Sequence, residues 1–539
     1  MLAQISTTPS ESGFALIDWL VLAGYFAILA VTGVLFARRK ASSSEDYFLG
    51  SRSMPSWAVA VSIVATSLSA VTFIGAPESA YKGDLTYLST NIGMILAAIV
   101  IALIFIPAFY RARSASIYEL LETRYGPAAR KSASVTFLIG RVLASGARVY
   151  AGAIPAAIVL FGVDKETNPQ YLIPAIAVLT LVGIVYTLAG GIRSVIWSDV
   201  IQFAILIGAA LTAIIIIASS INAPLDIVLN QLRSGTADGG SKLTLFDPSF
   251  DLKASFSLPA CIIGFTLLGI GSYGTDQDLA QRMLTCKDAK QGARSVIAGI
   301  LLGIPSVAVF LTLGLLLWVF YQRPELTSTQ HSISPNESMT VFLHYILTQI
   351  PPGVRGLLMA GLFAAGLSSL NSAINAMSAA FISDIYQPIM NARRVEPLSE
   401  RHLVRVGRLG VIAWGLVLGS FACVCIYWKN SDDQSLIDFA LSVMSLAYAG
   451  LVGVFFCALF TRRGSSASVI AALIIGFLWM LLSQPFVYNN FAFLERLGVE
   501  PYYQIHFTWK LTIGVLLAFS VCSFGSRQPK ASRAAPNAA

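Results

Sequence analysis

Long apolar stretches recur along the whole chain, separated by short polar segments. About thirteen of them reach roughly 20 residues, the length of helix that crosses a hydrocarbon core of about 30 Å. They lie at 17–37, 57–80, 87–110, 132–161, 170–189, 191–221, 257–276, 295–321, 353–386, 404–428, 436–460, 467–488 and 507–526. The pattern predicts an all-α polytopic membrane protein.

The longest polar interruption, 222–257, divides the central spans into two sets of five. This arrangement is typical of an inverted repeat, in which the first helix of each half is broken near the bilayer midplane. The first span of the first set contains "ATSLSA", and the first span after the interruption contains "GIGSYGTD". We therefore expect a helix break at both places.

The first expected break lies in "SIVATSLSAVTFIG", Ser62 to Gly75, which carries five hydroxyl side chains inside an apolar span. Hydroxyls in membrane helices often donate to the carbonyl four residues earlier, or help helices to pack. Irregular backbone at membrane depth, however, is tolerated only where it is buried or lines a cavity. The hydroxyls thus indicate either local bonding or a polar site.

Composition supports a membrane protein, since 56% of the 539 residues are hydrophobic and 12% are charged. With the N-terminus outside and the C-terminus cytoplasmic, most Lys and Arg fall in the inner segments, as the positive-inside rule requires. The net charge of +8 then reflects topology and contact with anionic lipid, and no nucleic-acid partner is expected. The cysteines lie mostly in apolar runs and imply no disulfide framework, which suits a bacterial inner membrane.

Several function classes fit the sequence poorly. It contains no GxSxG, P-loop, CxxC or HExxH motif, so we expect no enzyme. A passive channel needs a continuous polar path or charged rings, whereas the polar sites here are isolated. A sensor would need an output module, and the tail "GSRQPKASRAAPNAA" is short.

The ninth span, Met359 to Tyr386, clusters small polar side chains inside an apolar helix: Ser368, Ser369, Asn371 and Ser372. Hydroxyl and amide oxygens suit a hard cation that must be bound and then released. Asp199 in "VIWSDVIQF" is a second candidate, because intramembrane carboxylates are costly. The alternative for Asp199 is an ion pair with Arg193 at the inner membrane surface.

Five segments together resemble the sodium/solute symporter family, which has the LeuT-type fold with a 5+5 inverted repeat, one leader helix and two C-terminal helices. They are "SSSEDYFLGSRSMPSW", "SIYELLETRYG", "LAGGIRSVIWSDVIQ", "DQDLAQRMLTCKDAKQGAR" and "AAGLSSLNSAINAMSAAFISDIY". The resemblance implies a Na⁺ site formed by the carbonyls of Ala65, Leu68 and Ala365 and the hydroxyls of Ser368 and Ser369. Some members hold a further sodium at positions matching Asp199, Ser368, Asn371 and Ser372, where Asn371 replaces a common Ser.

The sequence departs from the sugar-carrying branch of that family. Ser67, Val71 and Thr72 replace an Asn and a Glu–Gln pair, and Ser272, beside Tyr273, replaces a tyrosine that stacks on sugar. "SLSAVTFIGAPESAY" is instead similar to the monocarboxylate and sialic acid branches, where positions matching Ser67, Ser69 and Thr72 bind a carboxylate.

A carboxylate substrate also requires a cation, and "GRVLASGARVYAGA" supplies Arg141 and Arg148. A buried guanidinium can bind a carboxylate through two hydrogen bonds. We assign Arg148 to the substrate and expect Arg141 to snorkel inward or to pair with a loop acid. Asp276 and Arg282 are interpreted as structural charges of an inner gate or loop.

The sequence therefore predicts a sodium-coupled symporter that imports a small organic solute, a carboxylate such as a monocarboxylate or sialic acid, by alternating access. A sodium/sugar or polyol symporter is the alternative. The substrate residues are Ser67, Ser69, Thr72, Arg148 and Tyr273. The expected partners are a small-molecule substrate and the lipid bilayer, with no obligate protein partner evident.

The predicted organisation has five parts. They are the N-terminus, leader helix and inner loop (1–56), the first repeat (57–221), an extracellular loop (222–257), the second repeat (258–460), and two extra helices with a cytoplasmic tail (461–539).

Overall fold

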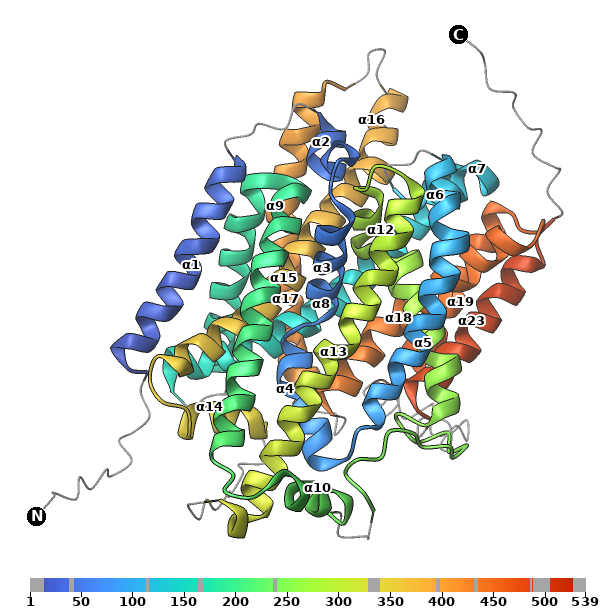
Figure 1. The fold of residues 1–539 in the computed structure, drawn as a ribbon. Coiled ribbons are helices and arrows are strands. Elements are labelled where there is room, and N and C mark those ends of the chain that lie inside the picture. The colour runs from blue at the N-terminus through green and yellow to red at the C-terminus, as the bar shows by residue number, and fades with distance from the viewer. Residues whose placement is uncertain are drawn as a thin grey trace, which may run out of the picture.

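The computed structural model describes residues 14–37, 43–112, 116–162, 168–235, 240–327, 340–393, 398–430, 435–484, 487 and 505–526. Within these ranges the regular structure is helical, apart from two isolated β-bridges. Figure 1 shows the long helices side by side in one bundle, with α2, α7 and α16 at one end and α10 at the other. The predicted all-α fold is confirmed.

The bundle is formed by helices of very different lengths. The first half contains α1 (Leu16–Ala37), α2 (Ser44–Leu49), α3 (Ser56–Ser67), α4 (Ala70–Lys82), α5 (Thr90–Val100), α6 (Ile106–Ala112), α7 (Glu119–Tyr125), α8 (Pro127–Phe161) and α9 (Pro169–Ser219). After α10 (Leu225–Arg233) come α11 (Phe265–Ile270), α12 (Gln277–Leu284), α13 (Ala289–Gln322), α14 (Val341–Thr348), α15 (Val354–Ala380), α16 (Gln387–Arg393), α17 (Glu400–Asn430), α18 (Leu436–Phe460), α19 (Ser466–Leu482) and α23 (Phe507–Ser523).

In the described part of the chain, 10 helical segments are long and apolar enough to cross a membrane, and α3 with α4 forms an eleventh span if counted together. The apolar helices α19 and α23 are shorter, at 17 residues each. Transmembrane helices range from about 17 to 25 residues, so both can also cross. The count of about thirteen stays a prediction.

Both expected breaks are present. Helix α3 ends at Ser67, Leu68 and Ser69 are extended, and α4 continues at an angle of 64° to α3. In the second half, α11 leads into a π-helix at Gly271–Thr275, and Asp276 is extended before α12 begins. Each break therefore opens a set of helices, as an inverted repeat requires.

Helix α9 contains two spans, 169–188 and 191–219, separated at Gly191. Gly191 has a φ of +61°, and a Cβ atom there would lie 2.6 Å from the Tyr47 carbonyl oxygen. Only glycine fits this close approach without strain. The turn places the second span of α9, which carries Asp199, beside α3.

Helix α15 lies at the centre of the bundle and packs against α1, α3, α8, α9 and α17. Its span is 89% buried, whereas only 28% of the α1 span is buried. The exposed apolar side chains of α1, such as Leu20 and Val31, are suited to contact lipid tails. Polar residues of α15 are therefore held away from lipid, among protein side chains.

Candidate functional site

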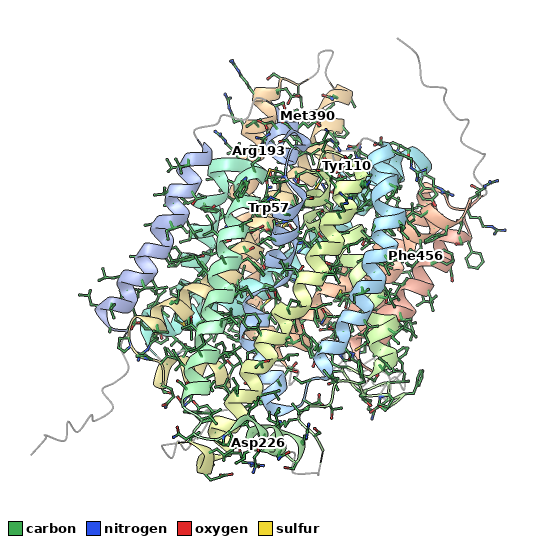
Figure 2. The ribbon with its side chains drawn as sticks, viewed as in Figure 1. Trp57, Tyr110, Arg193, Asp226, Met390 and Phe456 are labelled. Atoms are coloured by element: carbon green, nitrogen blue, oxygen red, sulfur yellow. The ribbon has the colours of Figure 1, made fainter. Side chains whose placement is uncertain are left out.

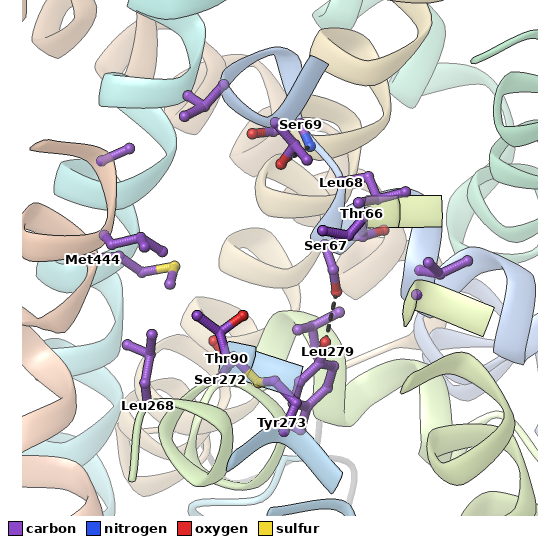
Figure 3. Close-up of a pocket in the computed structure, with 18 of the residues that line it drawn as sticks. Thr66, Ser67, Leu68, Ser69, Thr90, Leu268, Ser272, Tyr273, Leu279 and Met444 are labelled. Atoms are coloured by element: carbon purple, nitrogen blue, oxygen red, sulfur yellow. Dashed lines mark hydrogen bonds between the residues drawn. The ribbon is translucent and has the colours of Figure 1, made fainter. Parts of the chain in front are cut away.

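A cavity opens where α3 breaks, between the two broken helices and α5, α8, α13 and α18 (Figure 3). All five residues predicted to bind substrate line it: Ser67, Ser69, Thr72, Arg148 and Tyr273. The sequence pattern thus identified residues that are distant in the chain and share one cavity.

The hydroxyls of the first break take part in local bonds and also face the cavity. Ser67 Oγ donates to the Ile63 carbonyl at 2.8 Å and lies 2.9 Å from Tyr273 Oη, the contact drawn in Figure 3. Ser69 is the N-cap of α4, and its N–H donates to Thr72 Oγ1 at 3.4 Å. Local bonding and cavity lining, posed above as alternatives, therefore coexist.

The break also frees backbone carbonyls from helical hydrogen bonding. In a continuous helix the Ser69 N–H would donate to the Ala65 carbonyl, but here it points to Thr72 instead. The Ser369 hydroxyl of α15 lies 3.2 Å from the Thr66 carbonyl and 3.3 Å from the Ala365 carbonyl. The Ser369 hydroxyl and the Ala365 carbonyl, both predicted to hold sodium, thus lie where α15 packs against this break.

Asp199 is fully buried beside the same junction. Its Oδ1 accepts from Ser368 Oγ at 2.6 Å, and its Oδ2 accepts from Ser62 Oγ at 2.5 Å and Thr66 Oγ1 at 3.4 Å. Ser372 Oγ lies 3.3 Å from Thr66 Oγ1. Three of the four residues predicted for a second sodium, Asp199, Ser368 and Ser372, therefore belong to one hydrogen-bonded cluster.

The fourth residue of that set, Asn371, bonds in another direction. Its Oδ1 accepts from Thr187 Oγ1 on the first span of α9 at 3.2 Å. Adjacent residues on a helix point about 100° apart, so Asn371 and Ser372 face different neighbours.

The alternative of an Asp199–Arg193 ion pair is wrong. Arg193 donates to the Gly50 carbonyl and to Ser53 Oγ, both at 2.9 Å, and lies at the same end of the bundle as Tyr110 and Met390 (Figure 2). The ionic partner of Asp199 is Arg282 of α12, whose Nη2 is 3.2 Å from Oδ2. Arg282 lies within helix α12 and is only 1% exposed, so it is not a loop charge.

Arg141 and Arg148 lie on the same helix but differ in their partners. Arg141 is ion-paired with Asp276 and, at 3.2 Å, with Asp278. Its acidic partners therefore lie at the second helix break and in α12, and not in a loop. Arg148 lies 3.4 Å from the Thr66 carbonyl and 3.2 Å from Met444 Sδ. No carboxylate of the described residues lies within 4.0 Å of Arg148, which leaves its charge facing the cavity.

Other cavity residues were not found from sequence: Tyr87, Thr90, Asn91, Met444 and Tyr448. Tyr448 donates to Asp276 Oδ2 at 2.8 Å and so supports the Arg141 pair. These residues lie in ordinary amphipathic or apolar stretches, and only tertiary packing brings them to the cavity.

Two broken helices, a cavity at their junction that hydroxyls and a guanidinium line, and a buried cluster of a carboxylate and hydroxyls beside it are typical of a secondary transporter of the inverted-repeat class. The model of the sodium:solute symporter family matches residues 47–476. The chain belongs to this family.

Known relatives agree with this assignment. The sodium/sialic acid symporter SiaT of Proteus mirabilis (strain HI4320) is 30% identical over 497 residues, covering 90% of this chain and 93% of that protein. Human sodium-coupled monocarboxylate transporter 1 is 29% identical over 481 residues, covering 88% and 74%. A structure of a Na⁺-coupled sialic acid symporter, described as substrate-bound, outward-open and revealing a novel Na⁺ site, matches with a TM-score of 0.76 and 26% identity over 95% and 98% of the two chains.

Proposed function

We propose that this protein imports a small organic carboxylate together with sodium. The observation that carries the proposal is Arg148, a cation without an acidic partner among the described residues, in a cavity that touches the broken helix α3–α4. A partly buried charge without an acidic partner is costly, so the site favours an anionic ligand.

The start of α4 adds to this preference. Ser69, Val71 and Thr72 line the cavity at the first turn of α4. The Thr72 N–H donates to the Ser69 carbonyl, whereas the N–H groups of Ala70 and Val71 have no intrahelical acceptor. A helix N-terminus attracts negative charge. Arg148, the α4 N-terminus and the hydroxyls of Ser67 and Tyr273 would together hold a carboxylate and an adjacent polar group.

Sodium would bind beside this cavity at two places. The first comprises the carbonyls of Ala65, Leu68 and Ala365 with the hydroxyls of Ser368 and Ser369. The second comprises Asp199, Ser368 and Ser372, with Asn371 as a further candidate. Oxygen-only ligand sets of this kind suit a hard monovalent cation.

The balance of buried charges also supports a sodium ion and a carboxylate as the two transported species. The buried network contains three carboxylates, Asp199, Asp276 and Asp278, against two guanidinium groups, Arg141 and Arg282. With Arg148, which lines the same cavity, the count is three to three, so a sodium ion and a carboxylate bound together keep the site neutral. Sodium with a neutral sugar would leave an excess positive charge.

Transport would follow because sodium connects the α3 break with helix α15. Sodium bound between the α3 break and α15 would stabilise the conformation in which the cavity is preformed, so sodium favours substrate binding by population shift. Substrate would then complete the site, and rocking of the repeats would expose it to the other side. Loss of sodium would loosen the α3–α15 contact and release the substrate.

We further propose that the protein lies in the bacterial inner membrane with its N-terminus outside. The end that carries α2, α7 and α16 would then be cytoplasmic, in agreement with the Lys and Arg distribution. The Arg141–Asp276 pair, on the side of α12, would close the cavity toward the cytoplasm.

A thermal-shift screen tests the substrate class directly, because a ligand that binds only the folded state raises the melting temperature by mass action. Monocarboxylates, sialic acids, amino acids and neutral sugars are added to purified protein in sodium or in potassium at equal ionic strength. A sodium-dependent shift with a carboxylate is expected, and Arg148→Ala should abolish it, whereas Arg111→Ala, which removes an exposed arginine, should not. A shift with neutral sugars that survives Arg148→Ala would contradict the carboxylate proposal.

A further inference from the structure

Arg282 has an unusual position for a cation in a membrane protein. Its side chain is 1% exposed, yet every guanidinium nitrogen has a partner. Nε donates to Ser62 Oγ at 2.8 Å, Nη1 to the Asp278 carbonyl at 2.7 Å and to its Oδ1 at 2.8 Å, and Nη2 to Asp199 Oδ2 at 3.2 Å and to Ser372 Oγ. The side chain thus connects α12 with α3, α9 and α15.

Two of these partners, Asp199 and Ser372, are also assigned above to the second sodium. The Arg282 guanidinium places a full positive charge on the same oxygens that a sodium ion there would need. Two cations sharing one carboxylate in a buried site repel each other strongly, because low dielectric strengthens the interaction between charges. Full occupancy of this site by sodium therefore conflicts with the observed position of Arg282.

We propose that Arg282 is a tethered cation that competes with sodium for Asp199 and Ser372. The proposal rests on the sodium-coupled function proposed above. When sodium binds, Nη2 leaves Asp199, and when sodium departs, Arg282 returns and restores the charge balance without any ion from solution.

Asp278 provides the second position for the displaced charge. It already accepts from Arg282 Nη1, and it also pairs with Arg141 at 3.2 Å and lines the substrate cavity. A shift of Arg282 toward Asp278 would therefore alter the ion pairs that hold α12 against α8. Sodium binding at Asp199 would be coupled in this way to the part of the second broken helix that borders the cavity.

The rival explanation is that Arg282 is a scaffold that orients Asp199 for sodium. The two explanations predict opposite changes in sodium affinity when Arg282 is replaced. Removing a competitor raises sodium affinity, whereas removing a scaffold lowers it.

Sodium titrations of the purified full-length protein at pH 8, at constant ionic strength in potassium, separate the two. The readout is the melting temperature as a function of sodium concentration. For Arg282→Gln we expect half-saturation at a sodium concentration at least ~10-fold lower than in the wild type, since an uncompensated Asp199 attracts the ion. Arg282→Lys, which keeps the charge, should stay within about threefold of the wild type.

Ser62→Ala provides a milder variant, because Ser62 accepts from Arg282 Nε, donates to Asp199 Oδ2 and is not among the predicted sodium ligands. It should also lower the half-saturating concentration, by about two- to fivefold, since both lost hydrogen bonds hold Arg282 and Asp199 together. An unchanged or higher value in folded Arg282→Gln overturns the proposal, and the same result in Ser62→Ala does so if Arg282→Gln does not fold. A wild type that does not distinguish sodium from potassium contradicts the proposed function itself, independently of the variants.

Discussion

The two arginines of α8 show that the partners of a buried charge decide its role. Arg141 is ion-paired with Asp276 and Asp278, while Arg148 has no carboxylate of the described residues within 4.0 Å. Removing one member of a buried ion pair leaves the other charges uncompensated, which typically costs about 3–5 kcal/mol. The two side chains should therefore respond oppositely to the same substitution.

We expect Arg141→Met to lower the free energy of unfolding by several kcal/mol, about 3–5 kcal/mol as for other broken buried pairs. Arg148→Met should leave thermal stability in substrate-free buffer unchanged or higher, because a partly buried charge without an acidic partner is removed. Melting temperatures of the two purified variants provide the measurement. Equal destabilisation would show that Arg148 has a structural partner.

Ser369 allows a second test at single-residue scale. Its hydroxyl lies within 3.3 Å of two carbonyl oxygens at the α3–α15 junction. Ser369→Ala should raise the sodium concentration for half-maximal transport by about tenfold, since a hydrogen bond or ligand to a charged group contributes about 1.5–3 kcal/mol. Flux is measured against sodium concentration.

Ser378→Ala is the matched control for Ser369→Ala. Ser378 is a buried serine of the same helix, and its hydroxyl donates to the Gly407 carbonyl at 2.8 Å, outside the predicted sodium sites. Its sodium dependence should equal that of the wild type. If both variants shift alike, general loosening of α15 explains the effect better than ion binding.

At the scale of elements, the helix breaks were predictable because they have a local cause. Hydroxyl-rich and glycine-rich segments interrupt apolar spans at Ser67–Ala70 and Gly269–Asp276, and the α-helix is broken at both. The partner of Asp199 was not predictable, because Arg282 is 83 residues away and reaches it only through the packing of α12 on α3 and α15. Nor could sequence identify Asn91 or Tyr448 as cavity residues, since nothing in their own segments marks them.

The α3–α4 break should become more rigid when sodium binds. The Leu68 N–H still donates to the Val64 carbonyl at 2.9 Å, but the Ser69 N–H has only the Thr72 hydroxyl at 3.4 Å as a partner, so the Ser69 amide is expected to exchange readily. Hydrogen exchange should be slower for peptides covering 64–72 in sodium than in potassium, whereas peptides from α23 should be unaffected. Identical exchange in both salts would argue against an ion that contacts this break.

At the scale of the whole molecule, the arrangement of the bundle makes the proposed orientation testable. Asp226 on α10 and Arg393 at the end of α16 are exposed at opposite ends of the bundle. The six native cysteines are free, and all but the half-buried Cys423 are buried, so background labelling should be low.

In intact cells, a membrane-impermeant maleimide should label Asp226→Cys. It should label Arg393→Cys only after the membrane is opened. The reverse pattern would invert the proposed topology.

The central claim is that a sodium gradient drives uptake of a carboxylate through the Arg148 cavity, and transport into proteoliposomes tests it most directly. Purified protein is reconstituted, and the carboxylate that gives the largest thermal shift is supplied outside with sodium or with potassium. The account predicts accumulation above the external concentration only with inward-directed sodium, and its loss in Arg148→Ala. Equilibration without accumulation, or accumulation that ignores sodium, would contradict it.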